Sequence, residues 1–500
     1  MTVERDPPAE PVVDNDAPSA TFLAIRNALK LGGSLLFTWG IALGMRLLFP
    51  RFLGPVRFGT LNFADGFTTA FFTLLGLGAE AYIRKEVAVR PSHASDFFGG
   101  TFVIRGAMTA ALFGVMALIL HLGGRSIEVQ QVVFIYGAAQ FFVTANATFS
   151  AMLHAKGNVG AMSVLAVVTK VVWAGGVLIG MATNAGLWAY AASYLASEAI
   201  ESVVLYRLAQ NHLGLVFRVD RPATKAMLIA CIPYYLNLFA TTAYGKLDVS
   251  LLEFMTSSQE VGWYGASNAI AGLTLLITPL IGWVLMPMFA RAAARSREEL
   301  NEQVRRSMEL ILTVAIPASL MINLGADFWV HMIFGDAFMA AVPALRVLAT
   351  MFVLTYVAIV YAIVLIMLER AWTLTKISLL GLVVNVVLNL LFIRPAMAYF
   401  GPGGGGAGCA LAMLGTEIFV TGCMMSLVGR GAFDRRSIVA IAKSLAAYAI
   451  VYAAHRAMAP IGHLRIIVDG VLYLVLVLAT GALRLKEMYA VAREAVKNRG

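Results

Sequence analysis

Charged and amide side chains interrupt the long apolar stretches of this 500-residue sequence, and these side chains could do chemistry there. If the stretches cross a lipid bilayer, each charge at its centre costs roughly 2.5–3.5 kcal/mol and therefore needs a partner or a function. Cations at this depth would attract an anionic cargo, and acids would bind a proton or a sodium ion. The candidate cations are Arg46, Arg105, Lys170 and Lys246, the candidate acids are Asp65, Glu198, Asp248 and Glu417, and the candidate amides are Asn62, Asn268 and Asn385.

The elements that must position these groups are predicted to be membrane-spanning helices. Hydrophobic residues make up 60% of the chain and charged residues only 13%, whereas a soluble domain has about 25% charged residues. A helix crosses the hydrocarbon core in about twenty apolar residues. Such runs predict an all-α polytopic membrane protein with fourteen transmembrane helices at 28–50, 56–80, 98–121, 130–153, 159–182, 186–210, 226–256, 262–290, 308–333, 342–368, 373–394, 407–429, 437–458 and 464–483.

The distribution of Lys and Arg orients the predicted spans, because cytoplasmic loops carry an excess of these residues. With the amino terminus in the cytoplasm, 27 of the 38 Lys and Arg residues fall in cytoplasmic tails and loops and six in periplasmic connections. The remaining five lie within or at the edges of spans: Arg46, Arg105, Lys170, Lys246 and Arg346. This split predicts a multi-pass protein of the bacterial inner membrane with both termini in the cytoplasm.

Three short motifs recur six spans apart and in the same order. Phe58–Asn62 with Gly66 matches Tyr264–Asn268 with Gly272, Met152–Leu153 matches Met367–Leu368, and Ala191–Glu198 matches Ala410–Glu417. Because six is an even number, the two halves share one orientation and are related by an axis along the membrane normal. The repeat predicts two six-helix lobes around a central cavity, followed by two appended helices.

The repeat and the spans together predict the domain organisation. The segments are a disordered cytoplasmic tail (1–25), a first lobe (26–210), a cytoplasmic linker (211–225), a second lobe (226–430), spans thirteen and fourteen (431–483) and a basic cytoplasmic tail (484–500). The connections are too short for a soluble catalytic domain, so we expect no enzymatic activity. The glycine-rich stretch 401–406 lacks the Lys-Ser/Thr of a phosphate-binding loop, and we expect it to be a flexible turn.

Short motifs at defined places along the spans point to a known family. They are Arg51–Gly59 after the first span, Asp248 in the seventh, Glu260–Ala266 at the start of the eighth, Ile333–Ala341 after the ninth, Asn385–Asn389 in the eleventh and Gly405–Ala410 at the start of the twelfth. They resemble the polysaccharide transporter branch of the multidrug/oligosaccharidyl-lipid/polysaccharide (MOP) exporter superfamily, the Wzx-type oligosaccharide flippases. The resemblance covers most of residues 25–430. It implies two MATE-like lobes that carry a polyprenyl-diphosphate-linked oligosaccharide by alternating access.

The basic candidates each have two interpretations. Lys170 and Glu198 lie at similar depth in consecutive spans, so they form a structural ion pair, or Lys170 faces the cavity and attracts an anionic cargo. Arg46 and Lys246 occupy equivalent places in the two lobes, where they extend to the membrane interface or line the cavity. Arg105 lies near the cytoplasmic end of its span and is either an interfacial residue or a further cavity cation.

The acidic candidates are also open to two interpretations. Asp248 is two residues from Lys246 and lies on another face of the helix, so the two need different partners. Asp65 is the most isolated acid and a candidate proton or sodium site. Glu417 repeats Glu198 but has Asn385 rather than a cation beside it, which suits a proton carrier or a neutral, hydrogen-bonded glutamic acid.

The function expected from these observations is translocation of an undecaprenyl-diphosphate-linked oligosaccharide across the inner membrane for surface polysaccharide synthesis. The expected partners are this lipid-linked oligosaccharide, membrane lipid and a polysaccharide polymerase or co-polymerase, with no nucleic acid. No cofactor or metal is expected beyond a coupling proton or sodium ion, because the three cysteines lack metal-ligand spacing. The alternatives are a cation-coupled multidrug (MATE) antiporter, a lipid II flippase and, less favoured, a polysaccharide polymerase.

Overall fold

The computed structural model describes residues 20–155, 159–429 and 435–480, and these segments are mainly helical. The first half contains α1 (Ala20–Phe72), η1 (Thr73–Gly76), α2 (Glu80–Val89), α3 (His93–Leu122), α4 (Ile127–Ala155), α5 (Val159–Ala182) and α6 (Leu187–Leu213). The second half contains α7 (Arg221–Met255), α8 (Ser258–Ala271), η2 (Gly272–Ile277), α9 (Thr278–Arg295), α10 (Arg297–Leu324), α11 (Ala326–Phe334), η3 (Asp336–Ala341), α12 (Val342–Met367), α13 (Ala371–Phe400) and α14 (Gly404–Val428). Two further helices, α15 (Arg435–Ala457) and α16 (Arg465–Ala479), follow and are joined by η5 (Ala459–Leu464).

The first predicted span and most of the second lie in α1, which breaks at Gly54, and the rest of the second span continues through η1. This glycine has φ 72° and ψ 169°, and it lies between Pro50 and Pro55. Proline removes a backbone donor and disrupts the preceding turn, and glycine takes the positive φ without a side-chain clash. The residues that the resemblance singled out at 51–59 therefore form the sharp turn between two long helical segments.

The predicted spans fall on helices or on broken helix pairs of the structure. Seven helices are long and apolar enough to cross a membrane, or eight if the two segments of α7, bent by 59°, form one span. The predicted eighth span is divided among α8, η2 and α9, and α7 begins at Arg221, within the segment predicted as a linker. The protein is therefore an all-α polytopic membrane protein.

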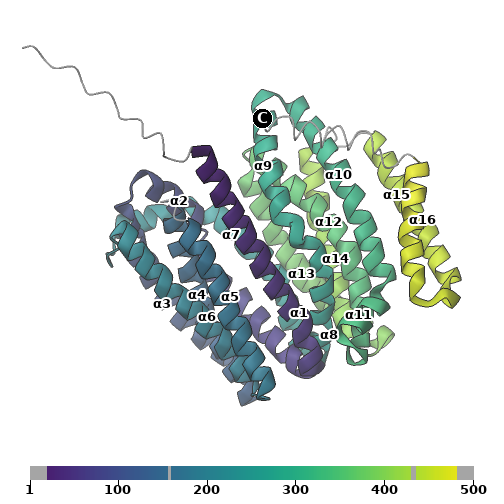
Figure 1. The fold of residues 1–500 in the computed structure, drawn as a ribbon, viewed down its shortest axis with the longest axis horizontal. Coiled ribbons are helices and arrows are strands. Elements are labelled where there is room, and N and C mark those ends of the chain that lie inside the picture. Colours follow the sequence, from purple (N-terminus) through teal and green to yellow (C-terminus); the bar gives the residue numbers. More distant parts are fainter. Residues whose placement is uncertain (1–19, 156–158, 430–434, 481–500) are drawn as a thin grey trace, which may run out of the picture.

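The two halves repeat the same helix contacts. In the first lobe, α1–α6, helix α6 packs against α4 and α5, and α5 packs against α1. In the second lobe, α7–α14, helix α14 packs against α12 and α13, and α13 packs against α7. The two groups lie side by side in Figure 1, and α15 and α16 form a hairpin at the outer side of the second lobe beside α10.

The lobes share an extensive hydrophobic core at one end of the molecule. We call the end at which α1 breaks at Gly54 the distal end, and the end at which α2 lies the proximal end. At the distal end one cluster joins Phe63 of α1 to Tyr264 of α8. Toward the proximal end Phe149 belongs to a cluster of first-lobe residues that also includes Met227 and Cys231 of α7, and Phe289 belongs to a separate second-lobe cluster. The lobes are thus joined by a broad core at the distal end and through α7 toward the proximal end.

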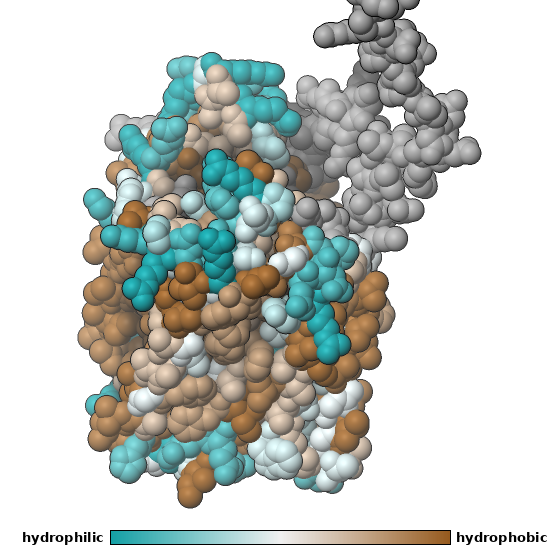
Figure 2. All heavy atoms as spheres, turned by 90° about the vertical axis from the view of Figure 1, so that its left-hand side faces the viewer, coloured by the Kyte–Doolittle hydropathy of each residue, from teal (hydrophilic) through white to brown (hydrophobic). Residues whose placement is uncertain are grey.

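The outer surface fits a bilayer. Figure 2 shows the side of the molecule on which the first lobe lies: hydrophobic residues cover its middle, and hydrophilic residues gather toward the upper and lower ends. Exposed apolar side chains on this lobe include Val164, Val168 and Ile179 of α5. A lipid-facing surface must be apolar in this way because hydrocarbon cannot hydrogen-bond polar groups.

Candidate functional site

Arg46 and Lys246 both reach across the boundary between the lobes. The guanidinium of Arg46, in α1, donates to the backbone carbonyl of Asn268 in α8 at 3.1 Å. The ammonium of Lys246, in α7, lies 3.0 Å from a carboxylate oxygen of Asp65 in α1. The first predicted span of each lobe therefore contacts the second predicted span of the other lobe, as a two-fold repeat requires.

The structure corrects the expectation that Asp65 is an isolated acid. Its side chain is 38% exposed and that of Lys246 is 37% exposed. The two residues are 181 positions apart, and only the packing of α7 against α1 brings them together. Asp65 is therefore the acidic partner of a half-exposed ion pair.

The repeated motifs that contain Asn62 and Asn268 face each other. A Cβ atom at Gly265 would lie 2.6 Å from the side-chain nitrogen of Asn62 and 3.0 Å from the ring of Phe58. Asn62 is therefore placed against α8, in the same contact surface as Arg46 and Asn268. Three residues predicted separately from the two lobes are thus neighbours in space.

Two tyrosines extend this site into the first lobe. The rings of Tyr136 (α4) and Tyr194 (α6) lie 5.5 Å apart between centroids. One turn after Tyr136, Gln140 of α4 donates to Thr69 of α1 at 3.0 Å, and Thr69 is one turn after Asp65, so this part of α4 packs on the part of α1 that carries Asp65. We call Arg46, Asp65, Tyr136, Tyr194 and Lys246 the interlobe cluster. The sequence analysis missed the tyrosines because aromatic residues are common in apolar helices and neither carries a charge.

Lys170 and Glu198 form an ion pair between α5 and α6, which is one of the two interpretations that the sequence left open. Their charged atoms lie 3.7 Å apart, and the side chains are 34% and 7% exposed. Asn146 of α4 donates a hydrogen bond to the carboxylate of Glu198 at 3.1 Å. Tyr194 lies one turn before Glu198 in α6 and its ring lies beside that of Tyr136, so the pair continues the interlobe cluster into the first lobe.

Asp248 has a different partner from Lys246, as its position in the helix predicts. The carboxylate is 1% exposed, and it accepts hydrogen bonds from the hydroxyl of Tyr264 in α8 and from the backbone of Val249. This contact fixes the distal part of α7 to α8 within the second lobe.

The second lobe surrounds its glutamate with neutral groups. Glu417 is 5% exposed, and its Oε2 atom has no hydrogen-bond partner within the described part of the chain. The nearby Asn385 donates to Thr416 at 3.4 Å and accepts from Asn389. Tyr244 of α7 lies within electrostatic range of Glu417. The predicted contrast with Glu198 is therefore present in the structure.

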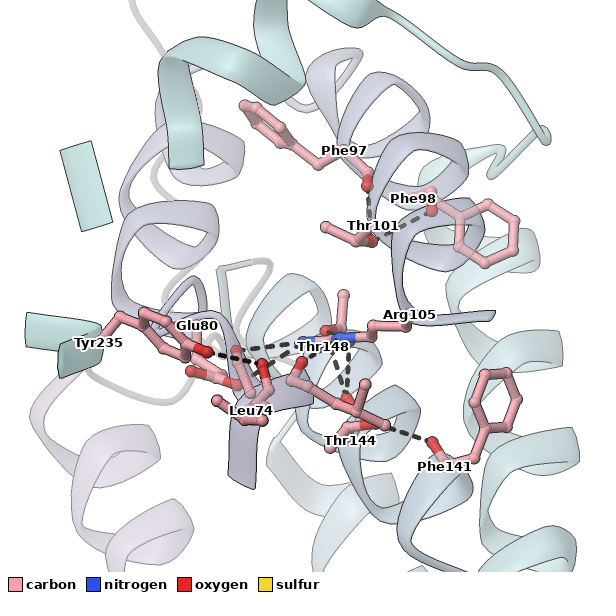
Figure 3. A network of polar contacts seen from close by, with 12 residues as sticks. Leu74, Glu80, Phe97, Phe98, Thr101, Arg105, Phe141, Thr144, Thr148 and Tyr235 are labelled. Atoms are coloured by element: carbon pink, nitrogen blue, oxygen red, sulfur yellow. Dashed lines mark hydrogen bonds and ion pairs between the residues drawn. The ribbon is translucent and has the colours of Figure 1, made fainter. Parts of the chain in front are cut away.

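Arg105 lies in a network of polar contacts with residues of η1 and α4 (Figure 3). Its side chain donates to the carbonyl oxygens of Leu75 at 2.7 Å, Gly76 at 3.3 Å and Thr144 at 2.9 Å. The residue is 2% exposed. This corrects the prediction that Arg105 is a cavity cation. The guanidinium instead binds one carbonyl group of α4 and two of η1. The carbonyl groups of η1 lack partners in an α-helix because the helix is interrupted after α1.

The glycine-rich stretch 401–406 is held in place, contrary to the expectation of a flexible turn. A carboxylate oxygen of Glu260 in α8 accepts from the backbone N–H of Gly403 at 2.7 Å, and the other accepts from Gly406 at 3.3 Å. Free N–H groups at the start of a helix bind anions. Here Glu260 is that anion, and it ties α8 to α14.

Fold and site together define a class: a helical membrane transporter fold made of two similar lobes, with a charged and aromatic cluster between them. Solved structures of membrane transport proteins have a similar fold. Lipid II flippase MurJ in an inward closed conformation matches with TM-score 0.69 and 12% identity over 89% of this chain and 97% of that one. An inward-facing MATE family multidrug resistance transporter of the MOP superfamily matches with TM-score 0.57 and 14% identity over 80% of this chain and 98% of the other.

A further match is a mutant of the Vibrio cholerae MATE transporter VcmN, with TM-score 0.55 and 14% identity over 82% of this chain and 100% of that one. Among curated protein sequences, none matches. The sequence model of a family described as "Polysaccharide biosynthesis protein" matches residues 24–293. That match spans more than half of the chain, and the chain belongs to this family.

Proposed function

We propose that this protein flips an undecaprenyl-diphosphate-linked oligosaccharide from the cytoplasmic to the periplasmic leaflet of the bacterial inner membrane, for surface polysaccharide synthesis. The observation that carries the proposal is the interlobe cluster, in which Arg46 and Lys246 place two cations between the lobes. Membership of a polysaccharide biosynthesis family and a flippase-type fold support it.

The chemistry of the cluster suits the head of such a lipid. A diphosphate is a compact anion that Arg and Lys bind with strong, charge-assisted hydrogen bonds. Sugar rings pack their apolar faces on aromatic side chains and donate hydroxyl hydrogens to carboxylates. Tyr136, Tyr194 and Asp65 supply these groups on the first-lobe side of the same cluster.

The arrangement of the lobes suits movement by alternating access, with the distal end as the periplasmic end. The shared core at the distal end closes that side, and the separate proximal cores leave the lobes joined there mainly through α7. Rocking about the cluster would open the distal side and close the proximal one. The headgroup would thus cross without entering hydrocarbon, while its polyprenyl tail stays in the lipid.

A multidrug antiporter is less favoured by the site. A site for cationic drugs needs acids and aromatic rings in excess of cations, and this cluster has two cations, Arg46 and Lys246, and one acid, Asp65. The balance of the cluster is therefore basic, which suits an anionic cargo.

Depletion of the protein in its host tests the proposal. We expect surface polysaccharide to be lost and lipid-linked repeat units to accumulate on the cytoplasmic side of the membrane. Re-expression of the wild-type protein should restore export, and the Arg46→Gln/Lys246→Gln double variant should not. Unchanged polysaccharide export on depletion would contradict the proposal.

A further inference from the structure

A second contact between the lobes lies at the distal end, outside the interlobe cluster. Arg125, between α3 and α4, lies 2.7 Å from a carboxylate oxygen of Glu253 near the end of α7. The same guanidinium donates to the backbone carbonyl of Glu253 at 2.6 Å. The Glu253 side chain is 1% exposed and that of Arg125 is 20% exposed, so the carboxylate is removed from solvent and the contact is not a loose surface pair.

Aromatic side chains enclose the pair. The guanidinium carbon of Arg125 lies 4.9 Å from the ring centroid of Phe254, a cation–π geometry. The ring of Phe254 also meets Phe63 of α1 edge-on at 5.7 Å. It lies so close to Gly123 that a Cβ atom there would be 2.8 Å from it. Phe254 is thus held by first-lobe residues from two elements.

The second-lobe side of this contact is firmly attached to its own lobe. Ser258 donates to Glu253 at 2.8 Å, and Tyr264 of α8 donates to Asp248, one turn earlier in α7. Separation of α8 from α1 would therefore carry Glu253 and Phe254 away from Arg125.

The backbones beside this contact meet without side chains between them. A Cβ atom at Gly59 would lie 1.6 Å from the carbonyl oxygen of Ser258, and one at Gly262 would lie 1.9 Å from the carbonyl oxygen of Pro55. Glycine at both places lets α1 and α8 approach to backbone contact. The distal end is therefore closed by the close-packed backbones of α1 and α8 and by the Arg125–Glu253 ion pair beside them.

We propose that Arg125, Glu253 and Phe254 form a latch that holds the distal end closed, and that the latch separates each time the distal end opens. The alternation of the two states rests on the proposed function, whereas the latch itself is a property of the protein without cargo. Removing one charge leaves the other buried and unpaired in the closed state, so the equilibrium shifts toward the state in which the lobes part.

The test is a distance measurement between the lobes in the full-length protein in lipid nanodiscs. Spin labels are placed at the exposed distal positions Trp188 and Tyr399, after substitution to Cys in a background with Cys231, Cys409 and Cys423 replaced by Ala. We expect Glu253→Gln to raise the ratio of long to short distances by at least about fivefold. Arg125→Lys keeps the positive charge but cannot contact the carboxylate and the backbone carbonyl of Glu253 at the same time. It should therefore raise the ratio of long to short distances by a smaller factor.

A matched control breaks an ion pair at the same end but within one lobe. Asp327 pairs with Arg346 at 2.5 Å between α11 and α12, and Asp327→Asn should leave the distances as in the unsubstituted background. Unchanged distances in both latch variants, or an equal shift in the control, would overturn the latch. The distance measurement needs no cargo, so it tests the latch independently of the proposed function. A protein that shows the expected change in distances but does not flip lipid-linked oligosaccharide would refute the proposed function and support the latch.

Discussion

The two lobes place a glutamate at the same point of their repeat and surround it differently. In the first lobe Glu198 is paired with Lys170 at 3.7 Å and bound by Asn146. In the second lobe Glu417 is buried beside Thr416 and the amides of α13, and no ion pair to it is present in the described residues. The same fold therefore carries charge in one lobe and neutral hydrogen bonds in the other.

This difference indicates a division of labour between the lobes. The acid and both tyrosines of the interlobe cluster come from the first lobe, and Lys170 extends the charged region behind them. The second lobe contributes Lys246, and its repeated acid, Glu417, lies beside Thr416 and the amides of α13. We infer that the headgroup of the cargo is bound mainly by the first lobe, while the second lobe closes over it.

The largest expected effect is on the cations between the lobes. The Arg46→Gln/Lys246→Gln double variant removes two charge-assisted hydrogen bonds to phosphate, each worth about 1.5–3 kcal/mol. Flipping by purified protein in vesicles should fall by about 100-fold or more. Arg346→Gln removes a cation that is paired within the second lobe and should leave the rate near that of the wild type. A double variant within threefold of the wild type would contradict the role of these cations.

A smaller effect is expected from Lys170→Met in the first lobe. Glu198 would be left buried without its cation, and the unfolding free energy should fall by roughly 1–3 kcal/mol, less than for a fully buried pair because Lys170 is partly exposed. Thermal unfolding in detergent measures the loss. Glu198→Gln added to Lys170→Met should recover most of it; no recovery would show that Lys170 stabilises the lobe in another way.

The smallest effect is expected from Glu417→Gln in the second lobe. The amide keeps the shape of the side chain and strands no cation, so stability should change by less than about 1 kcal/mol and flipping should stay close to the wild-type rate. A loss of flipping with normal stability would instead identify Glu417 as the coupling site for a proton or sodium ion. The two glutamates, Glu198 and Glu417, would then differ in function and not only in their surroundings.

Much of the fold follows from local features of the sequence. Length and apolarity locate the helices, and the repeat of Phe58–Asn62 at Tyr264–Asn268 predicts two related lobes. Helix geometry also predicts that Lys246 and Asp248 take different partners. These inferences succeed because they depend on residues close together in the chain or on a periodic pattern.

The site is less accessible to sequence reasoning because its partners are distant in the chain. Asp65 meets Lys246 only when α7 packs against α1, and Arg125 meets Glu253 only when the distal end is closed. Arg105 was predicted near an interface, but the break at η1 supplies buried carbonyl groups that bind it. Tyr136 and Tyr194 carry no signal that separates them from other aromatic residues in apolar helices.

The most direct test of the central claim is flipping by the purified protein in vesicles loaded with a fluorescent undecaprenyl-diphosphate-linked oligosaccharide. A membrane-impermeant reagent that destroys the label reports which leaflet holds it. We predict that the wild-type protein moves the lipid between leaflets and that the Arg46→Gln/Lys246→Gln variant does not. Movement no faster than in protein-free vesicles, with the wild-type protein folded and inserted, would contradict the account.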